Sequence, residues 1–595
     1  MSSIIMSMAI PNKPTKLVHN FANKYPKTQI ASSQKGWRQS CSLKHTADQT
    51  SDQIQSTRRS GNYKPTLWDF NRIQSLTSVY TEEKYATRAS ELVEQLKKQL
   101  CQESNWLKQL ELIDDLHKLG VSYHFDNEIN QVLNRIYMEQ KYCNNEERDL
   151  YSTALAFRLL RQNGFRVSQD VFDGFKNDGG EFKECLGGDT EGVLQLYEAS
   201  FLLTEGETSL EQARLFSKNL LQKKLDDEEV LDEFLSSLVR RSLELPLHWS
   251  VQRPNARWFA NAYSKKSQAN PILVELAKLD FNIVQAAYQE ELKEISRWWK
   301  ETELAEKLPF ARDRVLENYI WNIGLLFKPQ YGYARIMTTK LFILITVIDD
   351  VFDVYATLEE TQLFKNATQR WDDEAVDQLP YYMQICYMAL DSFINDMAYH
   401  ILKEKGVFVI QDLRKTWGDL CAAYAKEAEW YHTGYKPTME EYINVAWVSI
   451  SAHTILTHVF YLISNPIEKE AAESLRNYHD IARHSAMVLR LADDLGTSPY
   501  EMQRGDVPKA VECYMNETGA SREEAREHVM RMIREIWMKT NEERFRESPF
   551  SDDFIRSAAD LGRQAQYMYQ HGDGHGISNP EMKERILGLI FQPIV

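Results

Sequence analysis

The sequence contains no uninterrupted run of about 18 apolar residues, the shortest length expected of a membrane-spanning helix. Its best run, residues 341–348, stops at Asp349 and Asp350, whereas a spanning helix needs about 20 predominantly apolar residues. Cysteine is also scarce, and the seven cysteines form neither a CxxC pair nor a Cys/His cluster with zinc spacing. We therefore expect no membrane span, no zinc site, and reduced, mostly buried thiols.

Basic residues are outnumbered by acidic ones. The chain has 70 Lys and Arg residues against 86 Asp and Glu residues, which gives a formal net charge of −16. Binding to nucleic acid requires a dense basic surface that displaces counterions from the phosphates. The charge balance therefore argues against a nucleic-acid partner, and an anionic small molecule would need a local basic site or a metal ion.

Acidic residues are absent from the N-terminal segment before Asp48. Residues 1–57 are rich in serine and carry scattered Lys and Arg residues, without a sustained hydrophobic stretch. This composition is typical of an organellar transit peptide and not of a secretory signal. An ordinary unstructured tail is the alternative.

The rest of the chain has a helical pattern. At 595 residues it exceeds the size at which one hydrophobic core usually keeps growing, which predicts two domains. Apolar residues recur every three or four positions, as in Leu107, Leu110 and Ile113, and no run of alternating strands is present. The predicted fold class is all-α, with a weak boundary where Pro254 and Pro271 flank a Ser-rich stretch.

Three carboxylates surround the end of the best hydrophobic run. Asp349 and Asp353 are four residues apart and would share one face of a helix, with Asp350 about 100° around it. Burying such a set is unfavourable unless cations neutralise it, and paired carboxylate oxygens suit Mg²⁺. These residues are a candidate metal site, and a solvated acidic helix end is the alternative.

A second set of oxygen-bearing residues follows later in the chain. Asp493, Thr497 and Glu501 are spaced by four residues and would form one stripe over two helical turns, able to chelate a further divalent ion. Pro499 lies inside this stripe, and a proline within a helix removes a hydrogen bond and usually kinks the chain. A kink there would distort the register between Thr497 and Glu501.

Basic residues near both sets are candidates for holding a departing diphosphate. Arg312 and Arg314 follow Pro309, where we predict a loop or the first turn of a helix, and Arg490 and Lys509 accompany the second set. Arginine offers a fork of donors that matches phosphate oxygens. Taken singly, each of these residues is more often a surface charge.

Together these motifs resemble those of plant terpene synthases, over nearly all of the chain after the N-terminal segment. Arg58 and Arg59, followed after eight residues by Trp68, are similar to the tandem-arginine motif of the monoterpene branch. Residues 194–200 (LQLYEAS) and 297–299 (RWW) match further blocks, and the two acidic sets match the two metal motifs of the family. Five separated blocks in one order make the resemblance specific.

The resemblance implies two helical domains, an N-terminal α-barrel without catalytic activity of its own and a C-terminal helical bundle of the class I type. We accordingly divide the chain into a transit peptide (1–57), an N-terminal domain (58–265) and a catalytic domain (266–595). It further implies the plastid stroma as location and a monomer or weak homodimer. No DxDD motif occurs in the first half, so protonation-initiated cyclisation has no candidate acid there.

By the same resemblance the chain is a monoterpene synthase that ionises geranyl diphosphate with Mg²⁺ or Mn²⁺, as three bound ions. The implied metal ligands are Asp349, Asp353, Asp493, Thr497 and Glu501, with Asp350 behind them. The other implied site residues are Arg312, Arg490 and Lys509 for the diphosphate, Trp321 and Phe342 in the cavity wall, Tyr569 and His575 as catalytic residues, and Arg58, Arg59 and Trp68 as a cap.

Three other functions compete with this one. A sesquiterpene synthase acting on farnesyl diphosphate shares both metal motifs, but usually lacks the transit segment and the tandem arginines. A catalytically silent isoprenoid-binding protein would keep the helical bundle without needing the ligand set. A chain-elongating prenyltransferase would carry a second aspartate-rich motif, which residues 493–501 do not provide. The sequence favours the monoterpene synthase but does not select its product.

Three residues bear on how the reaction ends. Phe342 lies seven residues before Asp349, on nearly the same helix face but deeper, where a phenyl ring would exclude water. Some relatives carry Asn there, so Phe342 predicts olefins over alcohols and ethers. His453 favours alcohols and ethers instead, because an imidazole at a helix break beside the cavity would position water. His575, in the Gly-rich loop 571–576, matches the residue suggested as terminal base, with diphosphate as the competing base.

Overall fold

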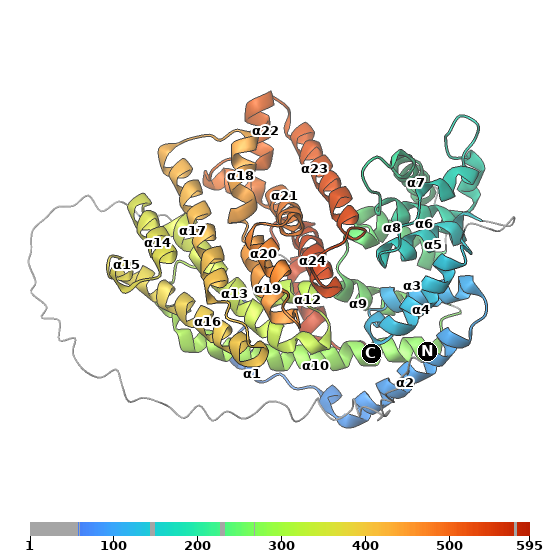
Figure 1. The fold of residues 1–595 in the computed structure, drawn as a ribbon, viewed down its shortest axis with the longest axis horizontal. Coiled ribbons are helices and arrows are strands. Elements are labelled where there is room, and N and C mark those ends of the chain that lie inside the picture. Colours follow the sequence, from blue (N-terminus) through green and yellow to red (C-terminus); the bar gives the residue numbers. More distant parts are fainter. Residues whose placement is uncertain (1–57, 59, 143–148, 227–231, 267, 576–579) are drawn as a thin grey trace, which may run out of the picture. The chain divides into compact units, whose positions relative to one another are not determined.

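The computed structural model describes residues 58–595, apart from residues 59, 143–148, 227–231, 267 and 576–579 and the side chains of residues 499–504. The predicted transit peptide lies outside the described residues. Arg58–Val595 form one compact unit built from helices (Figure 1). Among the described residues, the β pairing is limited to one isolated bridge between Lys176 and Phe182. The predicted all-α fold class is confirmed.

The first helices belong to the N-terminal half. They are α1 (Phe70–Gln74), α2 (Glu83–Gln102), α3 (Trp106–Lys118), α4 (Asp126–Met138), α5 (Leu150–Gln162), α6 (Thr190–Ser200), α7 (Thr208–Asp226), α8 (Glu233–Glu244) and α9 (Gln252–Tyr263). In this group α5 and α6 pack together, and α6 packs against α7 and α8.

The remaining helices begin with α10 and include the two predicted metal motifs. They are α10 (Pro271–Thr302), α11 (Leu304–Lys307), α12 (Val315–Leu325), α13 (Gly332–Asp350), α14 (Leu358–Arg370), α15 (Asp373–Asp377), α16 (Tyr381–Lys405), α17 (Ile410–Thr433), α18 (Met439–Ser449), α19 (Ala452–Ile463), α20 (Lys469–Arg476), α21 (Asp480–Arg504), α22 (Ala510–Thr518), α23 (Arg522–Glu543), α24 (Asp552–Tyr569) and α25 (Pro580–Ile586).

Local sequence signals set the helix ends that shape the site. α10 starts at Pro271 after Asn270, whose side chain accepts hydrogen bonds from the first-turn amides. α14 starts with a capping box formed by Thr357 and Glu360. α18 and α19 are separated at Ser451, whose φ of 67° is in the left-handed region that breaks a right-handed helix. This break turns residues 449–451 toward the cavity described below.

α13 and α21 are the helices that carry the two acidic sets, and both lie inside the C-terminal bundle. α13 is apolar around most of its circumference and packs against α10, α12, α16 and α19, as expected for a helix surrounded by others. α21 packs against α19, α23 and α24. Figure 1 shows these helices gathered around one centre. The packing therefore determines where both acidic sets lie.

α10 links the two helix groups. It packs against α2 and α9, and also against α12 and α13. The predicted boundary between residues 265 and 266 falls in the connection between α9 and α10. Since α10 contacts helices on both sides of this connection, the division into two domains at that point stays a prediction.

One stretch, Met439–Ile463, has the length and composition of a membrane-crossing helix. It comprises α18 and α19, and 72% of its most apolar part is buried inside the fold. Core helices of globular proteins pass the same test, so the stretch is weak evidence for a membrane span. The absence of a span stays a prediction.

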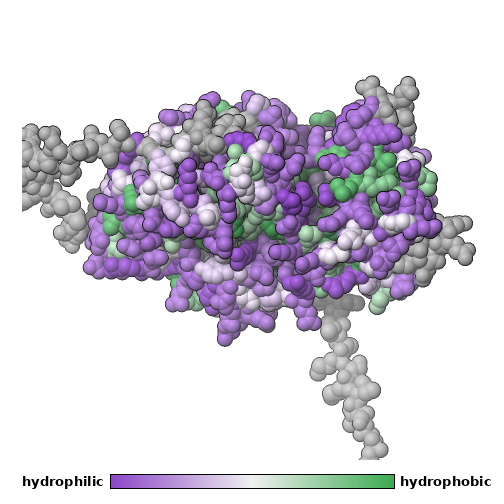
Figure 2. Space-filling view, turned by 90° about the horizontal axis from the view of Figure 1, so that it is seen from above, coloured by the Kyte–Doolittle hydropathy of each residue, from purple (hydrophilic) through white to green (hydrophobic). Residues whose placement is uncertain are grey.

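Hydrophilic residues cover most of the face seen in Figure 2, with smaller hydrophobic areas between them. The described cysteines are all unpaired. Cys386, Cys421 and Cys513 are buried, whereas Cys101 and Cys185 are exposed. Burial of most thiols therefore agrees with the described part of the chain, and their reduced state stays a prediction.

A buried ion pair ties α10 to α13. The Nη2 and Nε atoms of Arg335 donate to Glu291 at 2.6 and 2.9 Å, and Nη1 donates to the carbonyls of Leu326 and Lys328. The Tyr319 hydroxyl also donates to Glu291, at 2.7 Å. Both charges are thus paired and hydrogen-bonded, which a buried ion pair requires.

We predict that Glu291→Ala lowers the free energy of unfolding by about 3–5 kcal/mol, because Arg335 would stay buried without its counter-charge. The measurement is the denaturant-induced unfolding of the purified protein. Arg370, which pairs with Asp372 and Glu374 at the surface, supplies the control, and Arg370→Ala should leave the unfolding midpoint close to that of the parent. Equal losses in both variants would contradict the prediction.

Candidate active site

A cavity of about 430 Å³ lies within the C-terminal bundle. Side chains of α12, α13, α17, α19, α21 and α24 line it, together with residues 449–451 and the N-terminal residues 61–64. The predicted site residues that it brings together are Arg312, Trp321, Phe342, Asp349, Asp353, Arg490, Asp493, Thr497, Lys509, Tyr569 and His575. Predicted site residues from widely separated parts of the sequence therefore share one cavity.

Arg312 holds the first acidic set. It lies in the loop between α11 and α12, as the preceding Pro309 predicted. Its backbone N–H and Nε donate to Asp350 at 2.7 and 2.9 Å, and its Nη2 donates to Asp349 at 2.5 Å. Asp350 is fully buried and does not line the cavity, whereas Asp349 does. Asp350 therefore positions the arginine, and Asp349 faces the cavity.

Asp353 lies beyond the end of α13, in the π-helical turn η7 (Val351–Tyr355). The prediction of a regular α-helix through Asp353 is wrong in this detail, and such wide turns are frequent at functional sites. Both Asp349 and Asp353 nevertheless line the cavity. Burial raises the pKa of Asp353 well above its ordinary value, the charge of Asp349 adds to the effect, and Lys509 opposes it.

The second acidic set lies on α21, which continues through Pro499 to its end without interruption. Asp493 and Thr497 both line the cavity. The Thr497 hydroxyl donates to the backbone carbonyl of Asp493 at 2.9 Å, so its oxygen keeps lone pairs for another ligand. Glu501 belongs to the same helix, but its side chain lies outside the described residues. Asp493, Thr497 and Glu501 therefore lie on one continuous helix.

Arg490 is held in the same way as Arg312. Its guanidinium pairs with Asp493, and its Nε donates to Asp494 at 2.7 Å. Asp494 is fully buried and also accepts hydrogen bonds from the Tyr442 hydroxyl at 2.8 Å and the Ala510 amide at 3.0 Å. Burial raises the pKa of Asp493 to about 6, although Arg490 opposes the shift. In each set, one aspartate faces the cavity and its neighbour holds an arginine.

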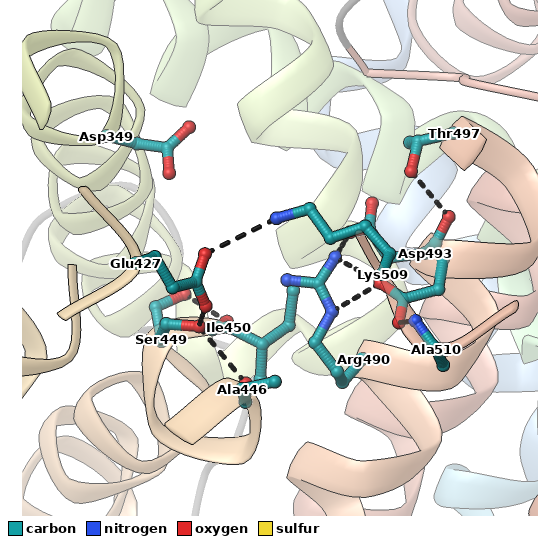
Figure 3. A network of polar contacts seen from close by, with 12 residues as sticks. Asp349, Glu427, Ala446, Ser449, Ile450, Arg490, Asp493, Thr497, Lys509 and Ala510 are labelled. Atoms are coloured by element: carbon teal, nitrogen blue, oxygen red, sulfur yellow. Dashed lines mark hydrogen bonds and ion pairs between the residues drawn. The ribbon is translucent and has the colours of Figure 1, made fainter. Parts of the chain in front are cut away.

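Lys509 and Glu427 join the two sides. Lys509 Nζ lies 3.3 Å from one carboxylate oxygen of Glu427. The other oxygen of this carboxylate accepts a hydrogen bond from the Ser449 hydroxyl. Figure 3 shows Asp349 on one side of the gap, Asp493 on the other, and Lys509 pointing into the space between them. Burial alone would raise the pKa of Glu427, but Lys509 and Arg490 outweigh it and the pKa falls below its ordinary value.

Sequence analysis missed Glu427. It is one of four acidic residues on α17, with Asp412, Asp419 and Glu429, and belongs to neither spaced set. The pairing with Lys509 across 82 positions cannot be read from local spacing. A buried acidic position on an otherwise apolar helix face was the one available signal.

Aromatic rings line the cavity beside the acidic sets. The ring centroid of Trp321 lies 6.1 Å from that of Phe342 and 5.9 Å from that of Tyr569. Ile345 and Ile455 extend the apolar wall. Burial raises the pKa of Tyr569 well above its ordinary value, and Asp493 adds to this, so the phenol stays protonated. The wall therefore offers neutral π faces and no competing nucleophilic anion from Tyr569.

His575 is a half-buried member of the cavity wall and packs edge-on against Trp321. Its Nε2 lies 3.3 Å from the Thr346 hydroxyl, whose own proton is directed at the Phe342 carbonyl, 2.9 Å away. Nδ1 has no hydrogen-bond partner among the described residues. Burial lowers the pKa of His575 well below its ordinary value, and Arg312 and Arg314 add to the effect, so the imidazole is neutral.

His453 does not line the cavity. Its ring packs against Tyr478, with the centroids 4.7 Å apart, and burial lowers its pKa to about 4. Ser449, Ile450 and Ser451 line the cavity at the helix break instead. The expectation that the His453 imidazole lies beside the cavity is therefore wrong, because the left-handed Ser451 turns the start of α19 away.

A strap of N-terminal residues (58 and 60–64) closes one side of the cavity, and Arg58 anchors it. The Arg58 guanidinium donates to both carboxylate oxygens of Glu360, at 2.7 and 2.8 Å, and to the Tyr355 carbonyl at 3.1 Å. Further along, Arg314 donates to the Lys64 carbonyl at 3.1 Å, and Arg312 lies over the Tyr63 ring. Arg58 itself does not line the cavity, so it holds the strap in place.

The other two residues of the predicted cap differ from Arg58. Arg59 lies outside the described residues. Trp68 is buried away from the cavity, where it stacks on Phe591 with ring centroids 5.3 Å apart. The cap that the structure describes is therefore residues 61–64, which sequence analysis did not single out, and Trp68 fixes the chain behind it.

The site has the donors that a divalent cation needs. No group of three or more His, Cys, Asp or Glu side chains converges at metal-binding distance in the described part of the chain. Instead, carboxylates line the cavity from η7 and α13 on one side and from α21 on the other. Mg²⁺ is usually held by one or two carboxylates and completed by water and phosphate oxygens. The repulsion between Asp349 and Asp353 is what such a cation would relieve.

Comparison with protein families gives two matches. Residues 300–539 match the model described as "Terpene synthase family, metal binding domain". Residues 67–243 match the model described as "Terpene synthase, N-terminal domain". The first match contains both acidic sets, and the two matches lie on either side of the predicted boundary.

Known proteins are similar over almost the whole chain. (−)-α-Terpineol synthase of Vitis vinifera is 52% identical over 90% of this chain and 91% of its own length. Cineole synthase 1, chloroplastic, of Salvia fruticosa is 51% identical over 99% of both. A structure of limonene synthase with 2-fluorolinalyl diphosphate has a TM-score of 0.88 and 53% identity, covering 90% of this chain and 100% of that one.

A second solved structure shows metal ions in a related protein. Isoprene synthase from grey poplar leaves (Populus x canescens), in complex with three Mg²⁺ ions and dimethylallyl-S-thiolodiphosphate, has a TM-score of 0.82 and 41% identity. The similarity covers 89% of this chain and 99% of that one. These similarities span both helix groups.

Proposed function

The chain belongs to the terpene synthase family, and we propose that it is a metal-dependent lyase that converts geranyl diphosphate into a monoterpene and diphosphate. One observation carries the proposal: two carboxylate sets, each with its own fixed arginine, face each other across a cavity whose remaining wall is aromatic and apolar. The relatives named for monoterpene products support geranyl diphosphate as the substrate over farnesyl diphosphate.

The polar side of the cavity binds the diphosphate. Arg312 and Arg490 present forked donors at fixed positions, and Lys509 supplies a point charge between them. Bound Mg²⁺ ions would be held by Asp349, Asp353, Asp493, Thr497 and Glu501 and would stabilise the charge that develops on the leaving group. Three ions, and Mn²⁺ as an alternative, are part of this proposal, and the related complex with three Mg²⁺ ions supports their number.

The apolar side of the cavity receives the allylic cation. The π faces of Trp321 and Phe342 attract positive charge, and their burial keeps water away from it. Tyr569 remains a neutral phenol there. The strap at residues 61–64 lines one side of the cavity and limits the access of water to the cation.

His575 is the proposed terminal base. A neutral imidazole can accept a proton, and its Nδ1 is the ring nitrogen without a hydrogen-bond partner among the described residues. The diphosphate group, held on the polar side by Arg312 and Arg490, is the competing acceptor. Proton loss to either group completes the formation of an olefin.

The location of the protein is proposed to be the plastid, and within it the stroma. The acid-poor, Ser-rich segment 1–57 supports this location. A relative that matches 99% of the chain is named chloroplastic. The oligomeric state, a monomer or a weak homodimer, stays a prediction.

We predict that conversion of geranyl diphosphate requires Mg²⁺ and that Asp349→Ala lowers turnover by at least about a hundredfold, as loss of one stabilising group at a developing charge does. Volatile products are measured by gas chromatography, with geranyl and farnesyl diphosphate assayed side by side. Asp373→Ala, at an exposed position on α15, is the matched control. Full turnover in metal-free buffer or in the Asp349→Ala protein refutes the mechanism, and faster turnover of farnesyl diphosphate refutes the substrate.

A chain that begins at residue 58 should keep full activity, because the removed segment is predicted to be a targeting sequence. A chain that begins at residue 61, or the variant Arg58→Ala, releases the strap from Glu360. We expect kcat/KM to fall on the order of tenfold, and more for geranyl than for linalyl diphosphate. Geranyl diphosphate must isomerise before ring closure, so its ion pair must stay enclosed for longer. Equal losses on both substrates would show a role in general closure instead.

We predict that the parent protein makes mainly olefins and that Phe342→Asn raises the fraction of alcohols. An amide in the apolar wall can hold a water molecule near the cation, whereas the phenyl ring excludes it. The product profile from geranyl diphosphate is the measurement. Phe408→Asn, the same substitution at an exposed position outside the cavity wall, is the matched control and should leave the profile unchanged. A parent profile dominated by an alcohol, or an unchanged profile in Phe342→Asn, contradicts the role of Phe342.

A further inference from the structure

A second cavity, of about 210 Å³, lies between the N-terminal helices and α24. Residues of α3, α5 and α9 line it on one side, and residues of α12 and α24 on the other. It shares no lining residue with the catalytic cavity among the described residues. Its wall contains four arginines, and neither the metal motifs nor the proposed reaction uses it.

Cationic side chains outnumber carboxylates in this wall. The cations are Lys118, Arg158, Lys328, Arg544, Arg556 and Arg563, and the carboxylates are Asp114, Asp126, Asp553 and Asp560. The two histidines of the wall add no charge, because burial lowers the pKa of His117 to about 4 and that of His248 well below its ordinary value. The cavity therefore carries positive charge in excess.

Every carboxylate of the wall already has a cation. The pairs are Asp114 with Lys118 and Arg158, Asp126 and Asp553 with Lys328, and Asp560 with Arg563, at distances of 2.6 to 3.7 Å. The excess charge is thus confined to Arg544 and Arg556.

The guanidinium groups of Arg544 and Arg556 make no hydrogen bond or ion pair with any residue in the described ranges. Both side chains are only partly exposed. Burial, with smaller contributions from the charges of Arg556 and Arg563, lowers the pKa of Arg544 to about 9. Asp553 and Asp560 attract these arginines only from beyond ion-pair distance. Two like charges without an ion-pair partner therefore share a half-open cavity, which is unfavourable unless an anion joins them.

We propose that this cavity binds a small oxyanion of the phosphate class between Arg544 and Arg556. Forked guanidinium donors match tetrahedral oxyanions, and the side-chain amide of Asn163, which uses one of its two N–H groups on the Leu159 carbonyl, stands in the same wall. The volume of about 210 Å³ is roughly half that of the catalytic cavity, so it suits a small anion better than a prenyl chain. The anion has two sources, free inorganic phosphate and the diphosphate released by the reaction, and the second rests on the proposed function.

The test is calorimetric titration of the full-length protein in metal-free buffer, at constant ionic strength set with chloride. Inorganic phosphate and inorganic diphosphate are titrated separately. Because Arg312 and Arg490 line the catalytic cavity, the background is the Arg312→Gln/Arg490→Gln protein. We expect saturable binding that is at least tenfold weaker when Arg544→Gln and Arg556→Gln are added. The exposed Arg546, which pairs with Glu543, supplies the control Arg546→Gln, which should bind like the background protein.

Phosphate binding with the same affinity in the Arg544→Gln/Arg556→Gln protein and in the Arg546→Gln control overturns the proposal, as does the lack of saturable binding to the background protein. Binding of both anions supports a general phosphate site, and binding of diphosphate alone supports the reaction product as its source. If circular dichroism shows that the double substitution prevents folding, Arg556→Gln alone is titrated, and unchanged affinity there overturns the proposal equally. Because no turnover is measured, failure of this proposal and failure of the proposed function are separate results.

Discussion

Burying several carboxylates around one cavity is the constraint on which the rest of this structure depends. Charges taken out of water are costly unless each is paired and hydrogen-bonded. The chain meets this requirement with two equivalent arrangements. Asp350 holds Arg312 beside Asp349, and Asp494 holds Arg490 beside Asp493. In both, the fully buried aspartate fixes the arginine and leaves its neighbour facing the cavity.

This arrangement also explains why the two basic groups are ready for an anion. A guanidinium held by a buried carboxylate cannot swing toward solvent, so its remaining N–H groups keep their direction. Lys509 is fixed in a similar way by Glu427, which Ser449 supports from the helix break. An enzyme that must stabilise charge on a leaving group gains most from donors that do not reorganise during the reaction.

How much of this was predictable differs from residue to residue. Asp349, Asp493 and Thr497 were predictable because helical spacing puts them on common faces, and α13 and α21 are helices there. The π-helical turn at Asp353 was not predictable. Its backbone hydrogen bonds are shifted by one residue from those of an α-helix, and residue spacing does not encode that shift. Glu427 pairs with Lys509 across the fold, and Trp68 packs on Phe591 at the other end of the chain. Contacts of this kind depend on tertiary packing and have no local sequence signal.

The aromatic wall links product choice to the packing of the whole bundle. Trp321 and Phe342 face the cavity from α12 and α13, whose other sides are buried against α10, α19 and α24. Interiors of this density transmit a change of even one methylene group to their neighbours. A substitution behind the wall therefore moves a ring that lines the cavity, although the substituted residue never touches the cavity. The shape of the cavity is therefore distributed over the helices that support the wall, and the strap anchored by Arg58 adds to it by holding residues 61–64 against the open side. On the proposed function, control of the product would be distributed in the same way.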